Sequence, residues 1–540
     1  MAPTRFCYPR FMEQPRQNTS SLLLFPLIFA VLFLTHAPLL RLPYFWDEAG
    51  YFVPAAYDLF RTGDLIPYTT LSNAHPPLVM IWLAAWWKLS NFAPAVSRVA
   101  MLVVASFGML GVFRLGERVA NTRVAVLTVV LTALYPTVFA QSSMAQLDIA
   151  AFALTVWAAY FYITRRMGWT LLFSALACLA KETAVAVPLT FFAWEIVCRV
   201  ARKRWPQWAA LWGMDPQPLG RAFAYLVALV PLALWYAYHA HVTGHILGNP
   251  EYLRYNLGAT VTPLRVLIAF FMRVWHVTGY MNLFVLTAAT VIAMRMPPLR
   301  DNGQERPRIA LKYQAVFGCL VLAHVVEFSV LGGAPLARYL VPVIPLVILL
   351  CASTLVRRVP QWPIWSAAVA IAFVAALLVN PPWRIAPEDN LAYSDFVRMH
   401  KSAAVYVEQH YGDDRILTAW PASDELNRPF LGYVKEPLTI VRVENFTLAQ
   451  MLRAKQQRES YDVVVAFNTK YEPPRNIFNR FAWWNRIQER YFDYHSDMRP
   501  EEIAQMLEGQ IAWQRSSGGQ WVAVIELYKI RNARLNPTRK

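Results

Sequence analysis

Two adjacent carboxylic acids, Asp47 and Glu48, follow the first long apolar segment of the chain. They stand among aromatic residues (Pro-Tyr-Phe-Trp-Asp-Glu-Ala-Gly-Tyr, residues 43–51) of the kind that favour a membrane surface. A carboxylate beside a bilayer is costly unless it has a partner or a use, and one such use is to take a proton from a hydroxyl group. The alternative interpretation of this pair is an ordinary solvated start of a loop.

Two other ionisable residues stand near the ends of later apolar segments. His75 begins the sequence His-Pro-Pro-Leu, in which the prolines keep it outside any helix. It suits contact with a phosphate or proton transfer, or it is simply a surface histidine beside a turn. Asp148 is the only charged residue between Arg123 and Arg165. It is a candidate for chemistry, and N-capping of a helix is its competing role.

A cationic set completes these candidates. Lys181 and its neighbour Glu182 separate two short apolar runs, either as site residues or as a pair that neutralises itself at a turn. Arg338 and Tyr339 begin another apolar run. A guanidinium fixed there suits a lipid phosphate, and the alternative is an interfacial arginine beside a tyrosine of the aromatic belt.

The composition is typical of a multi-spanning membrane protein rather than a soluble one. Hydrophobic residues make up 56% of the 540 residues and charged residues only 16%, and the mean hydropathy is +0.31. The net charge of +17 is carried mostly by short loops between apolar runs. This placement is typical of cytoplasmic loops, so the charge does not indicate a nucleic-acid partner.

The apolar runs predict about eleven transmembrane helices of a mainly α-helical polytopic protein. The predicted spans are Leu22–Leu40, Val99–Phe113, Val124–Ala140, Ile149–Thr164, Met167–Ala180, Thr183–Trp194, Ala222–Tyr238, Trp275–Met294, Tyr313–Leu331, Tyr339–Val356 and Trp362–Val379. The run Leu78–Trp87 is too short to cross, and we expect an interfacial or re-entrant helix there.

Loop charges set the predicted orientation. With the N-terminus in the cytoplasm, beside Arg5, Arg10 and Arg16, the cytoplasmic loops hold more Lys and Arg than the exterior loops. All the candidate site residues then lie at the exterior membrane surface. Because they come from separate segments, a shared site explains them more economically than chance does.

The composition changes after Pro381-Pro382-Trp383. We therefore predict a membrane domain over residues 1–385, with a first exterior loop at 43–97, and an exterior soluble α/β domain over 386–540. In the second domain we expect two helices and four strands: Ser394–His410, Arg415–Trp420, Leu438–Val443, Thr447–Glu459, Tyr461–Phe467 and Gln520–Ile530. Phe478–Tyr491 is aromatic and basic, which favours core or membrane-surface contact, with acceptor binding as an alternative. The five cysteines show no zinc-type spacing, and none follows residue 351.

The order of these motifs resembles the GT-C glycosyltransferases. The resemblance covers about residues 20–383, and its closest branch is that of the protein O-mannosyltransferases and the lipid A aminoarabinose transferase. It rests on the elements that begin at Trp46, His75 and Arg338 and on the lone Asp148. One departure is His75, because the aminoarabinose transferase has a lysine before the Pro-Pro-Leu. This difference weakens a specific lipid A assignment.

The resemblance implies an enzyme of the exterior (periplasmic) face of the bacterial inner membrane. A sugar would pass, with inversion, from a polyprenyl-phosphate donor to an acceptor hydroxyl of a glycan, a lipid or a protein. Asp47 would be the catalytic base, assisted by Asp148, with Glu48 in support. Arg338, His75 and Lys181, beside Tyr339, would bind the phosphate and sugar. No cofactor is obligatory, although Asp47, Glu48 and Asp148 offer hard oxygen ligands to a divalent cation. The competing function is a transporter or flippase of a lipid-linked sugar.

Overall fold

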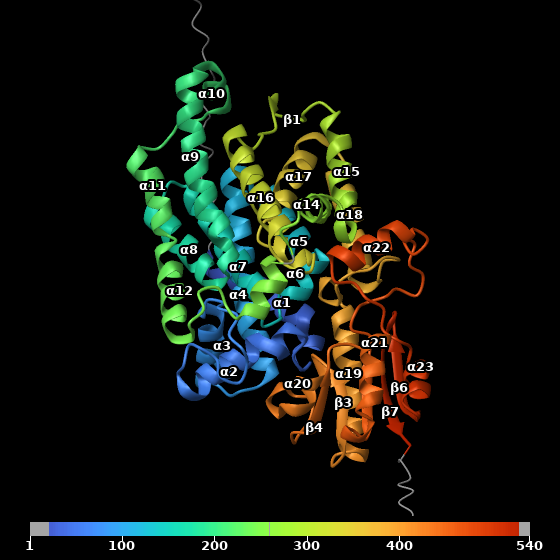
Figure 1. Cartoon of the computed structure of the whole chain (residues 1–540). Coiled ribbons are helices and arrows are strands. Elements are labelled where there is room, and N and C mark those ends of the chain that lie inside the picture. Colours follow the sequence, from blue (N-terminus) through green and yellow to red (C-terminus); the bar gives the residue numbers. More distant parts are fainter. Residues whose placement is uncertain (1–20, 259, 529–540) are drawn as a thin grey trace, which may run out of the picture.

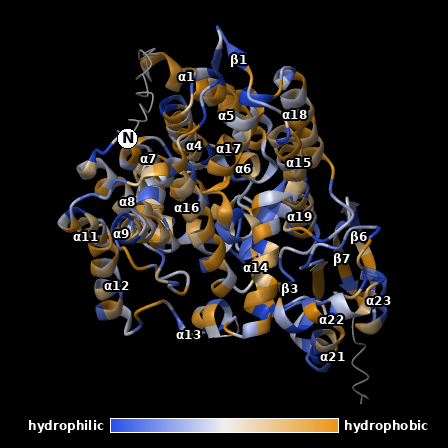
Figure 2. Ribbon diagram, turned by 90° about the horizontal axis from the view of Figure 1, so that it is seen from above, coloured by the Kyte–Doolittle hydropathy of each residue, from blue (hydrophilic) through white to orange (hydrophobic). Residues whose placement is uncertain are grey.

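The computed structural model describes residues 21–258 and 260–528, so Arg5, Arg10 and Arg16 lie outside the described residues. It consists of a helical bundle with a smaller sheet domain at one end (Figure 1). In Figure 2, the bundle helices carry mostly hydrophobic residues, whereas hydrophilic residues gather on the C-terminal helices α21–α23 and around β1. The bundle comprises α1 (Ser21–His36), α2 (Val53–Thr62), α3 (Leu78–Leu89), α4 (Pro94–Val119), α5 (Thr122–Leu134), α6 (Pro136–Gln141), α7 (Leu147–Ile163), α8 (Met167–Ala180), α9 (Ala186–Arg204), α10 (Pro206–Trp212), α11 (Leu219–Val227), α12 (Val230–Thr243), α13 (Pro250–Leu253), α14 (Pro263–Thr278), α15 (Leu283–Met294), the hairpin β1 (Arg300–Asp301) and β2 (Gln304–Glu305), α16 (Leu311–Val330), α17 (Ile344–Arg358) and α18 (Trp362–Leu378).

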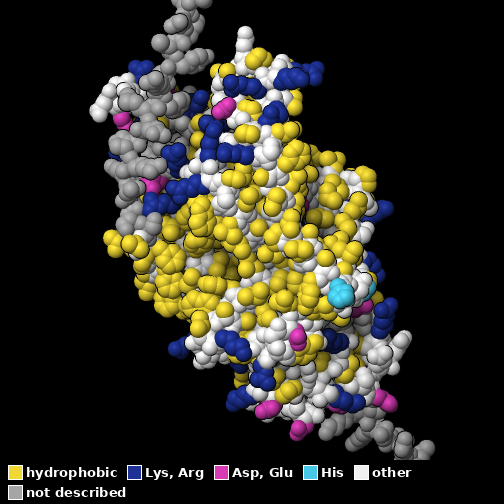
Figure 3. Space-filling view, turned by 90° about the vertical axis from the view of Figure 1, so that its left-hand side faces the viewer, with side chains coloured by type: hydrophobic (Ala, Val, Ile, Leu, Met, Phe, Trp, Pro, Cys, Tyr) yellow, Lys and Arg dark blue, Asp and Glu magenta, His cyan; other side chains and the backbone are white. Residues whose placement is uncertain are grey.

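The bundle has the apolar helices of a membrane protein. Within the described residues, six helical stretches are long and apolar enough to cross a bilayer: Leu22–Leu39, Pro94–Val119, Glu182–Arg204, Leu219–Thr243, Pro263–Met294 and Leu311–Val330. Five shorter helices, α3, α5, α7, α8 and α18, are also apolar. Figure 3 shows a broad hydrophobic band, with Lys and Arg side chains gathered at the edge of the band that is uppermost in the view. Such a band is the surface that a bilayer requires.

Three predicted spans differ from the helices observed. The predicted span Val124–Ala140 is broken between α5 and α6, because Pro136 forces extended backbone on Tyr135 (ψ 123°). The predicted span Trp275–Met294 is two helices, α14 and α15, separated by a turn in which Met281 and Asn282 have positive φ. The predicted span Ala222–Tyr238 is likewise divided into α11 and α12. Hydropathy alone carried no signal of these interruptions, since the residues at the breaks are themselves largely apolar.

The start of α4 is also earlier than predicted. The sequence placed Arg98 in a loop before a span that begins at Val99, but α4 begins at Pro94 after an extended Ala93. Proline suits the first turn of a helix because its missing N–H has no partner there in any case. Arg98 therefore lies within the first turns of α4, and its side chain is buried.

The C-terminal domain is built on a five-stranded mixed sheet in the order β4-β3-β5-β7-β6. Strands β3, β4 and β5 are parallel, whereas β7 is antiparallel to both β5 and β6. The elements are α19 (Ala392–His410), β3 (Arg415–Ala419), α20 (Ala422–Asn427), β4 (Thr439–Val443), α21 (Leu448–Gln456), β5 (Val463–Phe467), α22 (Ala482–Tyr491), α23 (Pro500–Met506), β6 (Gly509–Ser517) and β7 (Gln520–Leu527). The four predicted strands are present; β6 was missed because its residues do not alternate cleanly.

The sheet domain packs directly on the segment that follows α1. Tyr57 stacks on Phe430 with ring centroids 4.5 Å apart, and the ring centroids of Trp46 and Trp420 are 5.2 Å apart. A Cβ atom on Gly50 would lie 2.5 Å from the Trp420 ring, so glycine permits this close approach. The two domains therefore share a packed aromatic interface beside the first acidic pair.

Helix α22, all of whose residues are described, contributes no buried side chain. The expectation that Phe478–Tyr491 supplies core residues is therefore wrong for its helical part. Figure 1 places α22 beside the bundle, near α14 and α18. The contact is made in part by Arg265 of α14, whose Nε donates to the Tyr491 carbonyl oxygen (3.3 Å).

Candidate active site

Five turns at one end of the bundle bring the predicted polar residues together. Asp47 directly precedes the helical turn Glu48–Phe52, and Asp148 lies in the first turn of α7. Lys181 follows the last residue of α8, and Arg338 lies in a 3₁₀ turn before α17. A fifth turn, Pro387–Asp389, follows α18. Helix ends suit such a site because their unpaired backbone groups and their connecting loops meet the polar boundary.

Arg338 is the central cation of this cluster. Its guanidinium forms an ion pair with Asp47 and donates to the side-chain oxygen of Gln146. The Nε atom lies 3.8 Å from Asp148 Oδ2 and 3.6 Å from Glu388 Oε1. One buried guanidinium thus contacts side chains from three other segments, a geometry that its planar fork of donors allows.

Lys181 provides the second cation. Its Nζ donates to Asp148 Oδ1 at 2.5 Å and lies 4.3 Å from the centroid of the Tyr339 ring. That ring stacks on Phe328 with centroids 4.9 Å apart. Asp148 therefore lies between two cations. It does not act as an N-cap, since Gln146 occupies that position of α7.

His75 belongs to an adjoining pair. Its Nδ1 lies 3.1 Å from Glu182 Oε2, and the ring packs edge-on against Tyr51 and Tyr252. Lys181 and Glu182 thus take different partners, Asp148 and His75, instead of neutralising each other. This tight turn links the two parts of the polar cluster.

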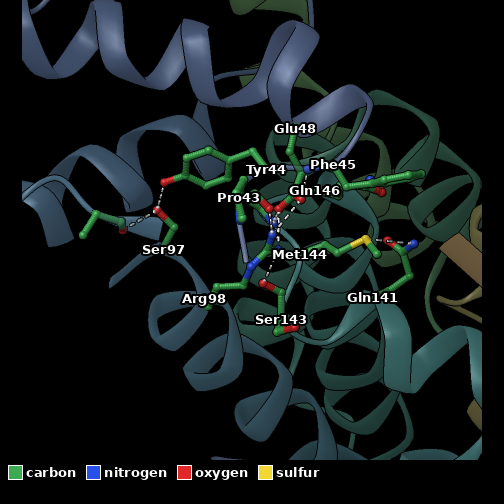
Figure 4. A network of polar contacts seen from close by, with 12 residues as sticks. Pro43, Tyr44, Phe45, Glu48, Ser97, Arg98, Gln141, Ser143, Met144 and Gln146 are labelled. Atoms are coloured by element: carbon green, nitrogen blue, oxygen red, sulfur yellow. Dashed lines mark hydrogen bonds and ion pairs between the residues drawn. The ribbon is translucent and has the colours of Figure 1, made fainter. Parts of the chain in front are cut away.

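Glu48 is buried and takes a different partner, Arg98 (Figure 4). Arg98 Nη1 donates to Glu48 Oε1 (2.8 Å) and Nη2 donates to Oε2 (3.1 Å). The backbone N–H groups of Phe45 (2.8 Å) and Ala145 (2.5 Å) donate to the same carboxylate. Arg98 also donates to the carbonyl oxygens of Pro43 and Ser143. This pair therefore ties the segment that carries Asp47 to the loop that precedes Asp148.

The acidic side chains of the site differ in how much of their surface is exposed. The Asp47 side chain is 31% exposed, whereas those of Asp148, Glu388 and Glu48 are 4%, 7% and 0% exposed. A catalytic acid or base must come within hydrogen-bond distance of its substrate. Asp47 is the carboxylate of this cluster that an incoming hydroxyl group can reach most directly.

Sequence reasoning missed Gln146, Arg98 and the acidic pair Glu388-Asp389. The pair lies in the segment after the last span, as Asp47-Glu48 lies in the segment after the first, and this parallel was the available signal. Burial raises the pKa of both carboxyl groups. The pKa of Asp389 rises to about 7, because the charge of Glu388 adds to the effect of burial. The hydroxyl of Tyr280 donates to Asp389 Oδ2 (2.6 Å).

The raised pKa of Asp389 predicts a pH-dependent stability. Between its ordinary pKa of 3.8 and about 7, the folded chain keeps this proton while the unfolded chain releases it. This contribution to stability is present below pH 3.8 and is lost as the pH rises through about 7. Between pH 5 and pH 8, we expect the melting temperature of Asp389→Asn to fall less than that of the wild-type protein. Thermal unfolding in detergent measures both. Asp413→Asn, at an exposed site, should keep the wild-type dependence; an equal dependence in Asp389→Asn would refute the prediction.

The three acids considered as metal ligands do not converge. Asp47 and Asp148 face Arg338 and Lys181, whereas Glu48 is enclosed by Arg98 and two backbone donors. Within residues 21–258 and 260–528, no group of three or more His, Cys, Asp or Glu side chains is arranged to hold a metal ion. These residues therefore do not fit the divalent site that the sequence left open.

Comparison with solved structures identifies the fold. The crystal structure of ArnT from Cupriavidus metallidurans in the apo state is 15% identical, with a TM-score of 0.52, and the match covers 93% of this chain and 97% of that chain. The structure of the same protein bound to undecaprenyl phosphate is 14% identical, with the same coverage and a TM-score of 0.50. AglB from Archaeoglobus fulgidus, in complex with an inhibitory peptide and a dolichol-phosphate, is 10% identical over 94% of this chain and 75% of that chain, and its TM-score of 0.45 is too low to support an argument.

No family model and no curated protein matches the sequence. The match to ArnT extends over both the helical bundle and the C-terminal sheet domain, since it covers nearly the whole of each chain. The predicted fold is thus confirmed: this chain shares the polytopic helical fold of ArnT, with a small C-terminal sheet domain.

Proposed function

We propose that this protein is a membrane glycosyltransferase that moves a sugar from a polyprenyl-phosphate donor to an acceptor hydroxyl, with inversion. The observation that carries the proposal is one accessible carboxylate, Asp47, beside two buried cations, Arg338 and Lys181. The fold supports it, because ArnT has been solved with undecaprenyl phosphate bound. The acceptor belongs to a glycan, a lipid or a protein.

Asp47 is the general base in this proposal. As the acceptor oxygen attacks the anomeric carbon, the carboxylate takes the hydroxyl proton, and the bond from that carbon to the lipid phosphate breaks. The ion pair with Arg338 holds the Asp47 side chain at the site before the donor arrives. Asp148 assists by holding both cations in place, and Glu48 positions the segment that carries the base.

The leaving group is the lipid phosphate, whose negative charge grows as the bond breaks. Arg338 and Lys181 are preorganised donors that stabilise this charge in a site shielded from water. His75 and Tyr339 lie next to the same cations and complete the proposed surface for the phosphate and sugar. The proposed reaction uses no metal ion at Asp47, Glu48 or Asp148.

The proposed orientation rests on the two ends of the molecule. The last turns of α9 and α17 are basic, at residues 202–204 and 357–358, and lie at the bundle end opposite the sheet domain (Figure 1). By the positive-inside rule, this charge supports a cytoplasmic position for that end and a periplasmic position for the site and the sheet domain.

The reaction distinguishes a transferase from a flippase. Purified protein in liposomes is supplied with a donor that carries labelled sugar on polyprenyl phosphate, together with cell-envelope extract as the acceptor source. A transferase releases bare polyprenyl phosphate and labels an acceptor. Recovery of the intact donor alone, on either face of the vesicle, would refute the proposal.

The role of Arg338 predicts a change in donor dependence. Arg338→Lys keeps the charge but loses the planar fork, so we expect the apparent KM for the donor to rise about 10-fold. Lys181→Gln should act in the same direction. The matched control is Arg306→Lys, at an exposed pair with Asp301 far from the site, and it should leave the donor KM unchanged. An unchanged donor KM in Arg338→Lys would show that Arg338 does not bind the donor phosphate.

A further inference from the structure

A polar cavity is lined by residues of α7, α8, α9, α11, the start of α16 and the loop that follows α10. The basic end of α9 and the start of α16 lie at the end of the bundle opposite the sheet domain (Figure 1). Three cations line it from separate elements: Arg165 after α7, Arg221 on α11 and Lys312 on α16. The rest of the wall combines aromatic and apolar side chains, among them Trp194 and Tyr225, with the polar side chains of Thr170, Glu195, Asp215 and Gln217. The cavity shares no residue with the candidate active site.

The buried acid of this cavity is already satisfied. Glu195 accepts hydrogen bonds from the Tyr162 hydroxyl (2.7 Å) and from the backbone N–H of Gln217 (2.8 Å). Arg199 Nη2 in turn donates to the Gln217 carbonyl oxygen (2.6 Å). These bonds fix the loop between α10 and α11 as one wall, and they occupy both oxygens of the carboxylate with neutral donors.

The cations at the rim lack enough countercharge. Asp215 is exposed and is shared loosely between Arg165 (3.6 Å) and Arg202 (3.8 Å). Within residues 21–258 and 260–528, no carboxylate lies within 4.0 Å of the charged groups of Arg221 or Lys312. Two cations from different helices thus face one cavity without an acid to neutralise them, so the cavity suits an anion.

The surroundings indicate that this anion has an apolar part. Exposed Trp205, Trp208 and Leu211 on or beside α10 and exposed Phe223 on α11 surround this end of the bundle. Tryptophan beside Lys and Arg is typical of the boundary between lipid and water. This end of the bundle therefore offers a ligand both cations and aromatic rings.

We propose that this cavity binds the headgroup phosphate of an anionic phospholipid. Arg221, Lys312 and Arg165 contact the phosphate oxygens, and the apolar part of the lipid lies against Trp194 and Tyr225. Both cation types suit phosphate, the guanidinium through paired donors and the ammonium as a compact charge. The site is a lipid site on the face opposite the proposed chemistry, and it does not depend on the proposed function.

The test compares lipids on the full chain in a neutral detergent. Phosphatidylglycerol should raise the melting temperature of the wild-type protein, whereas phosphatidylcholine and inorganic phosphate at equal concentration should not. In the double variant Arg221→Gln/Lys312→Gln we expect the apparent affinity for phosphatidylglycerol, from the concentration dependence of the shift, to fall about 10-fold or more. The charge-matched control is Arg295→Gln/Arg308→Gln, two exposed arginines outside the cavity, and it should respond as the wild type does.

Three results would overturn this proposal. They are an equal shift with phosphatidylcholine, an equal shift with inorganic phosphate alone, which would make this a free-phosphate site, and an unchanged phosphatidylglycerol affinity in the cavity variant. Should the double variant fold poorly, the single variant Lys312→Gln serves instead. Native mass spectrometry then measures its retained phosphatidylglycerol, which should be lower than in the control.

Discussion

Asp47→Asn is expected to lower the rate of sugar transfer by about 100-fold or more, the usual contribution of a general base. The substitution keeps the size of the side chain and its hydrogen bonding to Arg338, but it removes the proton acceptor. Donor binding should change little, because Arg338 and Lys181 keep their other contacts with Asp148 and Glu388. The measurement is initial transfer rate in reconstituted vesicles, beside direct binding of undecaprenyl phosphate.

Asp64→Asn is the matched control for this variant. Asp64 lies in the same first loop and is exposed, so its loss changes the charge of the loop without touching the site. It should transfer sugar at the wild-type rate. Transfer by Asp47→Asn at more than a tenth of that rate would exclude Asp47 as the base and direct attention to Glu388.

Glu48→Gln is expected to destabilise the protein by about 3–5 kcal/mol, the cost of leaving a buried charge without its partner. Arg98 is 1% exposed and Glu48 is 0% exposed, so no water reaches the guanidinium once the carboxylate is removed. The amide also cannot accept from Arg98, Phe45 and Ala145 together as two carboxylate oxygens do. The measurement is the midpoint of thermal unfolding in detergent.

A pair with an exposed carboxylate and two hydrogen bonds provides the comparison. Arg306 donates to both oxygens of Asp301, at 3.0 and 3.1 Å, on the surface hairpin. Asp301→Asn should cost no more than about 1 kcal/mol because solvent screens this pair. If the two variants unfold at the same temperature, the buried pair does not hold the first loop to the loop before α7.

The sequence predicted the features that depend on contiguous residues. Apolar runs located the helices, since hydrophobic length is a property of contiguous residues. Strands such as Val463–Phe467 could be predicted for the same reason. The interruptions within spans were missed because hydropathy does not register a local breaker such as Pro136 or the turn at Met281 and Asn282.

The candidate site divides in the same way. Residue types and sidedness singled out Asp47, Asp148, Lys181 and Arg338 and predicted that they meet, and the structure brings these four together. The sequence could not predict which partner each of two adjacent residues takes. Lys181 and its neighbour Glu182 take different partners, one in each part of the polar cluster.

Asp47 and Glu48 illustrate the boundary most clearly. The sequence by itself determined that two acids follow the first apolar segment, and it predicted that they stand at a membrane surface, because composition and loop charge indicate where a chain crosses. Only the tertiary structure decided which acid is partly exposed and which is enclosed by Arg98. The reason is physical: the direction of a side chain and its counterion are set by contacts between segments far apart in the chain, such as Glu48 with Arg98 and Asp47 with Arg338.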